Sequence, residues 1–371
     1  MSIVFFLLSV YNISMKIFID CRMLGSGGIG TYLESVLPYL TKQNDCILLC
    51  AQNQEEKLLA YKEKAEILHT QIKTFSFKEL LFFPKDLCKR INECDLYYSP
   101  YCNVPSGIKI PVFTTIHDIV FLDVPGLSSK AGTFARKFFY QHSINRSKAV
   151  FTVSQFSADR IKQKLKLKNT PLVVTYNSVP EWFLNEERTT EAPAAPKDNS
   201  IIFVGNIKKH KGLSTLLDAF TICKKQGLDA RLVIIGNAEN FRSGDEETVK
   251  KLAELKDNDI SFTGKISDSE LKSFYKKARV LVQPSLYEGF GMPPMEALIL
   301  GTNVILSDIP VFKEIYKDFP VTFFKMQDAQ DLAQKITETF NKPEPLQSSI
   351  PNKYSFKKTS EIITDTFRRF I

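Results

Sequence analysis

Short apolar runs alternate with amphipathic stretches along most of the chain, and polar turn residues separate them. In the first half, the apolar runs predict buried strands at 15–20, 46–50, 111–116, 149–153 and 172–177. The pattern restarts in the second half and predicts strands at 200–205, 231–236, 260–264, 279–283 and 303–307. Stretches with helical spacing lie between these strands, at 32–40, 158–167, 213–223, 248–255, 271–278 and 311–316. This alternation is typical of parallel sheets with helices on both faces, so we predict two doubly wound α/β domains.

The boundary between the two halves is marked by composition. Residues 185–200 are polar and rich in Pro and Ala, as is typical of a linker. We therefore assign 1–184 to an N-terminal Rossmann-like domain and 200–350 to a C-terminal one. The remaining segment, 351–371, has helical apolar spacing and is predicted to form a C-terminal helix. A length of 371 residues also favours two domains.

The stretch 283–301 carries the most informative motif. A predicted strand ends there, a turn containing Gly289 and Gly291 follows, and a short helix comes next. Glu288 lies in the turn and Glu296 in the first helical turn. Free backbone N–H groups at such a turn can bind an anion, and carboxylates beside it can orient hydroxyl groups, so a nucleotide diphosphate sugar would fit. The alternative is a helix start whose glutamates merely suit the helix dipole, and the spacing alone leaves both interpretations open.

A second glycine motif follows the first predicted strand. Gly25-x-Gly27-x-x-Gly30 matches the dinucleotide fingerprint and makes an NAD-dependent oxidoreductase an alternative function. Two details weigh against that alternative. Four residues separate Asp20 from the first glycine, and no acidic residue follows the second strand at 46–50. The glycines would still allow the backbone to approach a phosphate closely.

Two further candidates stand at the carboxyl ends of predicted strands, where open α/β sheets place their sites. His117 and Asp118 follow the strand at 111–116. The basic run 208–211, which ends in Lys211, lies between the strand at 200–205 and a predicted helix. A lone His is usually structural and a basic run is usually a solvated face, but their positions favour a ligand site.

Composition narrows the remaining possibilities. The net charge of +8 is too diffuse to identify a partner, and we expect no nucleic-acid partner. Seven cysteines without a C-x-x-C pair indicate reduced thiols in a cytoplasmic protein. Asp257 and Asp259 form a D-x-D sequence in a polar turn before a strand, so we interpret them as turn residues. We expect no metal and no cofactor.

Three segments bear on membrane contact. Residues 1–14 are apolar but too short to span a bilayer, and they lack a basic region and a small-residue cleavage site, so we expect no signal peptide and no structural need for them. The segments 75–91 and 134–146 mix aromatic residues with Lys and Arg. Such segments suit the anionic inner face of the cell membrane, and the alternative is that their apolar faces belong to the core.

The motifs, taken in order, resemble those of the family 4 retaining glycosyltransferases of the GT-B fold, and the resemblance covers residues 15–371. It implies two Rossmann-like domains facing a central cleft, with the C-terminal helix crossing back to the N-terminal domain. The short N-terminal half with its glycine loop resembles that of bacterial mannosyl- and rhamnosyltransferases of surface polysaccharide assembly. The resemblance therefore implies metal-independent transfer of a hexose, first of all mannose from GDP-mannose, to a glycan or polyprenyl-diphosphate-linked acceptor. A non-catalytic sugar-nucleotide-binding protein is a further alternative, but all expected motif positions are filled.

The resemblance also assigns roles. It implies that Glu288 approaches the transferred sugar, that His117 faces that sugar and the acceptor, and that Lys211 grips the diphosphate, so these three are the candidate catalytic residues. The family usually has Arg as its second cation, and here only Lys209 or His210 stands nearby. The candidate substrate-binding residues are Gly27, Gly28, Asp118, Lys209, His210, Lys265, Ile266, Gly289, Phe290, Gly291 and Glu296, the last of which would hold the ribose.

Overall fold

The computed structural model describes residues 14–185, 197–236, 248, 250–252, 259–342 and 348–371. The expectation for residues 1–14 and most of the predicted linker at 185–200 therefore lie outside the described residues. The same holds for Asp257 and for much of the helix predicted at 248–255.

The N-terminal domain is built on a parallel sheet of seven strands in the order β3-β2-β1-β4-β5-β6-β7. The strands are β1 (Lys16–Asp20), β2 (Asp45–Cys50), β3 (Ala65–His69), β4 (Leu96–Ser99), β5 (Val112–Thr115), β6 (Ala149–Thr152) and β7 (Leu172–Val174). The helices around it are α1 (Gly27–Gln43), α2 (Phe77–Leu81), α3 (Lys85–Asn92), α4 (Val120–Asp123), α5 (Lys130–Arg146), α6 (Gln155–Lys164) and α7 (Glu181–Asn185). The order reverses direction at β1, which creates a crevice at the carboxyl ends of the strands.

The C-terminal domain repeats this plan with six parallel strands in the order β10-β9-β8-β11-β12-β13. Its strands are β8 (Ser200–Val204), β9 (Arg231–Ile235), β10 (Ile260–Gly264), β11 (Val280–Gln283), β12 (Asn303–Ser307) and β13 (Thr322–Phe324). Its helices are α8 (Leu213–Lys225), α10 (Asp268–Lys277), α11 (Pro293–Ile299), α12 (Pro310–Tyr316) and α13 (Ala329–Phe340). A capping box begins α10, because Ser267 Oγ accepts a hydrogen bond from Glu270 N–H and the Glu270 carboxylate accepts one from Ser267 N–H.

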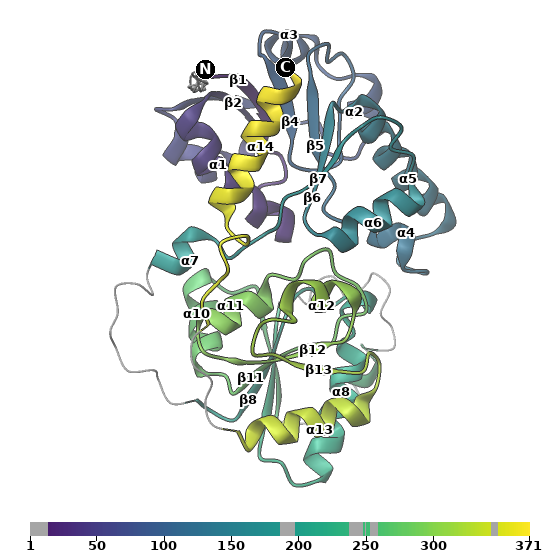
Figure 1. Ribbon diagram of the computed structural model, residues 1–371, viewed down its shortest axis with the longest axis vertical. Helices are drawn as coiled ribbons and strands as arrows, with labels where there is room; N and C mark the ends of the chain where they lie inside the picture. Colours follow the sequence, from purple (N-terminus) through teal and green to yellow (C-terminus); the bar gives the residue numbers. More distant parts are fainter. Residues whose placement is uncertain (1–13, 186–196, 237–247, 249, 253–258, 343–347) are drawn as a thin grey trace, which may run out of the picture.

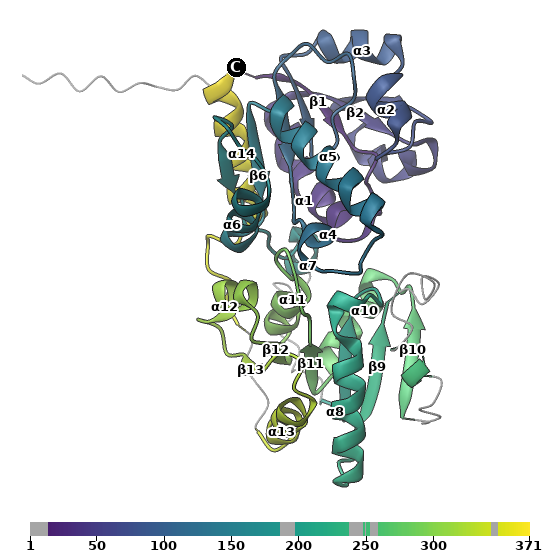
Figure 2. The same ribbon diagram turned by 90° about the vertical axis from the view of Figure 1, so that its right-hand side faces the viewer.

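The last helix, α14 (Phe356–Phe370), packs on the N-terminal domain, beside α1 (Figures 1 and 2). Its apolar face places Phe356, Ile363 and Phe367 in the same core cluster as the strands of that sheet. The Phe367 ring lies 4.7 Å from the ring of Phe113, centroid to centroid. The chain therefore returns from the C-terminal domain and ends on the N-terminal domain.

Direct contacts fix the two domains against each other beside the crevice. The Glu314 carboxylate of α12 accepts hydrogen bonds from the N–H groups of Gln155 (2.8 Å) and Phe156 (2.7 Å) at the start of α6. A carboxylate is stabilised there by the free N–H groups and the helix dipole. On the same side, the Tyr287 hydroxyl donates to Asp123 over 3.0 Å. Among the described residues, no helix is long and apolar enough to cross a membrane.

Candidate active site between the two domains

The strand-to-helix turn after β11 places one of the two motif glutamates beside a lysine from a different loop. The Glu288 carboxylate accepts bonds from Lys211 Nζ at 2.7 and 2.9 Å, and a third from Ser285 Oγ at 2.8 Å. Both charged side chains are largely shielded from solvent, at 24% exposure for Lys211 and 12% for Glu288. Residues separated by 77 positions in the sequence thus form one ion pair in the cleft.

A glycine allows this ion pair to form. Gly212 follows the short 3₁₀ turn Lys209–Lys211 and has a φ of +67°, and a Cβ there would lie 2.0 Å from the Pro284 carbonyl oxygen. Only glycine fits such a conformation and such a close approach. The neighbouring His210 carbonyl accepts a 2.8 Å bond from Leu286 N–H. The loops after β8 and β11 are therefore packed directly against each other.

The second motif glutamate, Glu296, is more deeply buried than Glu288. Glu296 occupies α11, is 9% exposed, and accepts a 2.7 Å hydrogen bond from the Tyr275 hydroxyl. Burial raises the pKa of the Glu296 carboxyl to about 7, against the opposing effect of the Tyr275 hydrogen bond. It also lines the cleft, so its second oxygen can take a ligand hydroxyl.

The N-terminal domain contributes His117 and Asp118 from the end of β5. The His117 Nε2 lies 2.8 Å from the Pro100 carbonyl oxygen, which can only accept, so Nε2 carries the hydrogen and Nδ1 a lone pair. Burial lowers the pKa of His117 to about 4, which keeps the ring neutral at neutral pH. The Asp118 Oδ1 accepts from Val120 N–H over 3.0 Å, and burial raises the pKa of this carboxyl.

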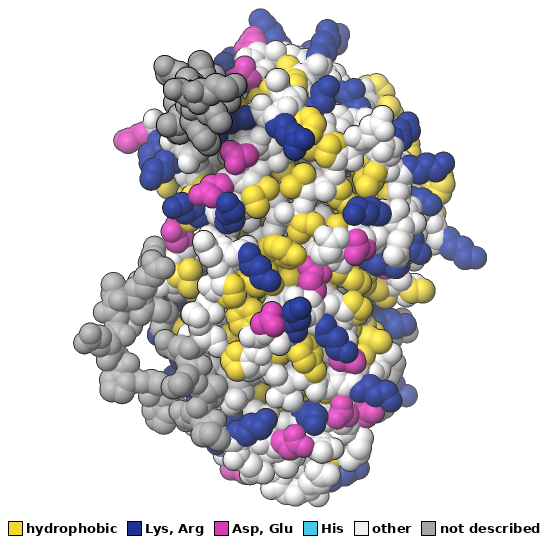
Figure 3. Space-filling model, in the orientation of Figure 1, with side chains coloured by type: hydrophobic (Ala, Val, Ile, Leu, Met, Phe, Trp, Pro, Cys, Tyr) yellow, Lys and Arg dark blue, Asp and Glu magenta, His cyan; other side chains and the backbone are white. Residues whose placement is uncertain are grey.

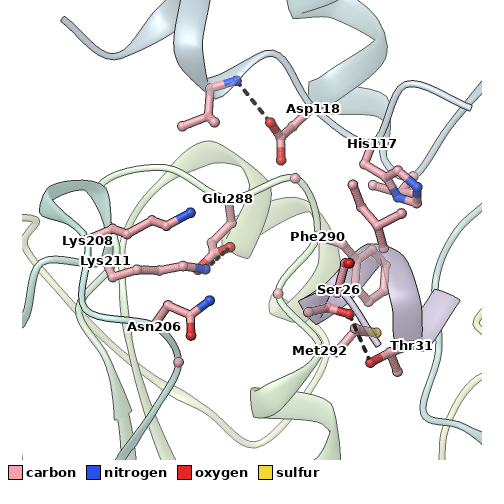
Figure 4. A pocket seen from close by; sticks show the side chains of 18 of the residues that line it. Ser26, Thr31, His117, Asp118, Asn206, Lys208, Lys211, Glu288, Phe290 and Met292 are labelled. Atoms are coloured by element: carbon pink, nitrogen blue, oxygen red, sulfur yellow. Dashed lines mark hydrogen bonds and ion pairs between the residues drawn. The ribbon is translucent and has the colours of Figure 1, made fainter. Parts of the chain in front are cut away.

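The glycine turn of the C-terminal domain reaches across to these residues (Figure 4). A Cβ on Gly289 would lie 3.0 Å from the His117 carbonyl oxygen and 3.2 Å from Asp118, so a larger residue would push the domains apart. The Gly289 carbonyl accepts a 2.7 Å hydrogen bond from Ser154, the residue before α6. Gly291 has a φ of +83°, and a Cβ there would overlap the Phe312 ring.

The glycine loop of the N-terminal domain faces the same turn from the opposite side. Gly25 and Gly27 adopt positive φ angles of 74° and 55°, as a tight loop before α1 requires. The Gly28 position lies near the C-terminal domain, because a Cβ there would be 3.8 Å from the Met292 Cε.

Together these elements enclose a cleft of about 1100 Å³ lined by both domains. Of the predicted site residues, those on its walls are Gly27, Gly28, His117, Asp118, His210, Lys211, Lys265, Ile266, Glu288, Gly289, Phe290, Gly291 and Glu296. Lys209 is exposed and is not among the lining residues. Its neighbour Lys208 lines the cleft instead, with Asn206 beside it (Figure 4).

Comparison with known proteins identifies the family. Residues 26–181 match the family model described as Glycosyltransferase Family 4, and residues 185–356 match Glycosyl transferases group 1. The chain belongs to glycosyltransferase family 4. This membership gives no support to the oxidoreductase alternative.

Relatives within this family include mannosyltransferases. The O-antigen chain mannosyltransferase RfbU of Salmonella typhimurium is 34% identical over 202 residues, which cover 54% of this chain and 53% of that protein. The O-antigen chain mannosyltransferase B of Escherichia coli is 24% identical over 60% of this chain and 59% of that protein. These two matches span between half and three fifths of the relatives' length.

Solved structures show the same fold. HepE of Anabaena, in complex with UDP and glucose, matches 96% of this glycosyltransferase with a TM-score of 0.64 and 16% identity, over 95% of its own chain. Sucrose-phosphate synthase of Thermosynechococcus elongatus gives the same TM-score and identity, over 96% of this chain and 94% of its own. With its two parallel-sheet domains, this glycosyltransferase has the GT-B fold.

Some cleft residues of this glycosyltransferase were not among the predicted site residues. Lys208, Asn206 and Arg136 line the cleft, and Arg136 comes from the middle of α5. The spacing of Lys208 and Lys211 is a signal that could have placed Lys208 on the cleft wall with Lys211, because residues i and i+3 lie on one side of a 3₁₀ turn.

Proposed function

We propose that the protein transfers a hexose, first of all mannose from GDP-mannose, to a hydroxyl of a glycan or polyprenyl-diphosphate-linked acceptor. The proposal includes retention at the anomeric carbon and no metal requirement. The observation that carries it is the Lys211–Glu288 pair in the interdomain cleft, with the buried Glu296 on the same wall. The two mannosyltransferase relatives support mannose as the sugar.

Departure of the nucleoside diphosphate from an oxocarbenium-like carbon sets the barrier in such a reaction, so stabilising the leaving charge is the main task of the site. Lys211 would leave Glu288 and contact the diphosphate, with Lys208 beside it on the same wall. The glycines of both domains would let backbone N–H groups approach the same phosphates. Glu288, released from Lys211, would accept hydrogen bonds from hydroxyls of the transferred sugar.

The other groups would position the reactants. Glu296 would accept a ribose hydroxyl. His117 is neutral and held by Pro100, so it would act on the sugar or acceptor through hydrogen bonding rather than through charge. The Glu288 carboxylate accepts hydrogen bonds from Lys211 and Ser285. We therefore assign Glu288 a binding role and do not assign it as a covalent nucleophile. The acceptor would attack from the leaving-group face and pass its proton to the departing diphosphate.

A panel of nucleotide sugars tests this function. We expect GDP-mannose to raise the melting temperature and to be turned over with a lipid-linked acceptor, because a ligand that binds only the folded state stabilises it. Turnover of another sugar would replace mannose but keep the reaction class. Donor binding with no turnover on any acceptor would favour the non-catalytic binding protein. NAD binding without sugar-nucleotide binding would favour the oxidoreductase.

We also propose that the N-terminal domain contacts the anionic inner face of the membrane. The segments 75–91 and 134–146 are partly core, since Phe83, Leu87 and Phe139 are buried. They also carry exposed apolar side chains, which we call the outer apolar patch, namely Phe77, Leu81, Phe82, Phe134 and Phe138.

Exposed lysines on α2 and α5 accompany this patch, and hydrophobic side chains lie among Lys and Arg on the right-hand side of this domain (Figure 3). Aromatic residues between cations suit a bilayer surface with negative charge. We expect co-sedimentation with anionic vesicles at low salt and weaker binding to neutral ones. Absence of binding to both would contradict the membrane proposal.

A further inference from the structure

Arg136 stands out in the cleft because, among the described residues, no carboxylate or other hydrogen-bond acceptor pairs with its guanidinium group. The residue lies in the middle of α5 and lines the cleft on the side of the N-terminal domain. It forms no hydrogen bond or ion pair within the described parts of the chain, and its buried Nε has no acceptor. By contrast, Arg160 in the same domain is bound by both oxygens of Asp123, at 2.9 and 2.6 Å. A shielded guanidinium without an acceptor is unfavourable unless a ligand supplies one.

The orientation of Arg136 is set by an aromatic ring. Its guanidinium carbon lies 3.6 Å from the centroid of the Phe121 ring, which also lines the cleft. This stacking holds the planar group by one face and leaves its N–H edges available. A guanidinium presented in this way matches the geometry of a phosphate or carboxylate.

A second cation, from the C-terminal domain, lines the same cleft and is close enough to Arg136 for the two charges to repel each other. Lys208 lines the cleft from the C-terminal domain. Its pKa is lowered, first by burial and then by repulsion from Lys211 and Arg136, with Asp118 acting in the opposite direction. Cations from both domains thus converge, a distribution of charge that favours an anionic ligand.

Aromatic rings in contact with one another extend from the cleft wall to the protein surface. Phe75 lines the cleft, and its ring lies 5.6 Å from that of Tyr101 and 6.4 Å from that of Phe139, both of which also line it. The Phe139 ring lies 6.1 Å from Phe77 and 6.2 Å from Phe138, which belong to the outer apolar patch. A series of ring contacts therefore connects the cleft wall to Phe77 and Phe138 of the outer apolar patch.

We propose that Arg136 binds the phosphate group of a lipid-linked acceptor, whose apolar chain leaves the cleft along Phe75 and Phe139 to the outer apolar patch. This assignment rests on the proposed transfer function and specifies its acceptor side. The ligand class is a phosphorylated lipid, because an anionic group joined directly to an apolar chain is what the cation and the adjoining aromatic path would bind together. Arg136 comes from the N-terminal domain, whereas the proposed donor contacts Lys211 and Glu296 come from the C-terminal domain.

Calorimetry with farnesyl diphosphate as the probe tests the proposal, with the donor site first saturated with GDP, and with UDP in parallel. We expect wild-type protein to bind farnesyl diphosphate and Arg136→Ala to bind it about tenfold or more weakly, the scale for losing a charged hydrogen bond. Lys164→Ala is the control, because Lys164 lies on α6, is exposed, and neither lines the cleft nor belongs to the outer apolar patch. It should retain wild-type affinity.

Two further probes separate the head group from the chain. Farnesol lacks the charge and inorganic diphosphate lacks the chain, so each should bind more weakly than farnesyl diphosphate. Wild-type affinity in Arg136→Ala, or no binding of farnesyl diphosphate to the wild type, would overturn the proposal. Inorganic diphosphate binding as tightly as farnesyl diphosphate would overturn the lipid assignment.

The nucleotide affinity of each variant distinguishes this inference from the donor assignment. We expect Arg136→Ala to keep the wild-type affinity for GDP or UDP and the wild-type melting temperature. An equal loss of nucleotide affinity would place Arg136 in the donor site and overturn the inference. If the wild type binds neither nucleotide, the donor assignment fails, and the comparison of Arg136→Ala with the wild type, repeated without nucleotide, still decides the role of Arg136.

Discussion

The buried carboxyl of Glu296 makes stability depend on pH in a way that one substitution can reveal. Burial raises the pKa of Glu296 to about 7 from an ordinary value of 4.5. Between these two values the folded protein holds a proton that the unfolded chain has released. Stability therefore falls as the pH rises through this window, and the loss is complete above about pH 7.

The size of the effect follows from the two pKa values. Each pKa unit corresponds to about 1.4 kcal/mol, so ionising Glu296 lowers the free energy of unfolding by about 3 kcal/mol at pH 8. Glu296→Gln removes this loss, because the amide cannot ionise. It keeps the side-chain shape and an oxygen that can accept the Tyr275 hydroxyl. We therefore expect the variant to exceed the wild type by up to about 3 kcal/mol at pH 8 and to match it near pH 4.5.

Urea unfolding of both proteins, without nucleotide, between pH 5 and pH 8.5 measures this difference. The comparison must be between variants, because burial also raises the pKa of Glu79 to about 7 and gives both proteins the same underlying slope. Parallel stability curves, or a less stable variant at pH 8, would refute the reasoning and show that Glu296 is already ionised in the free protein. Circular dichroism and tryptophan fluorescence should be followed together, since two domains need not unfold in one step.

The remaining predictions concern the chemistry. Lys211→Ala should lower kcat/KM by about a hundredfold or more, the scale for one lost electrostatic stabiliser, and wild-type steady-state kinetics in this variant would contradict its role. His117→Ala should reduce transfer while leaving calorimetric nucleotide affinity nearly unchanged, because His117 is on the N-terminal wall; a matching loss of nucleotide affinity would argue otherwise. Nucleotide affinity should rise with pH through about 7 in the wild type, since the ionised Glu296 is the better acceptor for a ribose hydroxyl, and a Glu296→Gln variant with the same pH profile would count against that contact.

Most of the strands that the sequence predicted are buried and central, because apolar runs report burial directly, although the predicted strands β7 and β10 lie at sheet edges and are only partly buried. The structure adds β3, β4 and β13, which no prediction included. Strand β3 has the mixed sequence AEILH at the sheet edge, and β13 has only three residues. Strand β4 is fully buried but short and dominated by tyrosine, so its apolar signal is weak.

The site residues also differ in how far the local sequence could identify them. Glu288, His117 and Lys211 could be chosen from the sequence because each follows the carboxyl end of a strand, and Glu296 because it lies in the first turn of the helix that comes next. Of the two residues considered for the second cation, His210 lines the cleft and Lys209 does not, whereas Lys208, the residue before the 3₁₀ turn, lines it without having been assigned a role. Arg136 has no local signal at all, since only the packing of α5 brings it to the cleft.

The ion pair between Lys211 and Glu288 links residues whose roles were first considered separately. Each charge would be unfavourable alone in a shielded cleft, and the pair satisfies both before a donor arrives. A donor diphosphate would replace the carboxylate as the partner of Lys211 and free Glu288 for the sugar hydroxyls. Substituting either residue therefore changes the state of the other in the free protein. Their contributions to catalysis should not add, and a double-mutant cycle measures the coupling that the 2.7 Å contact implies.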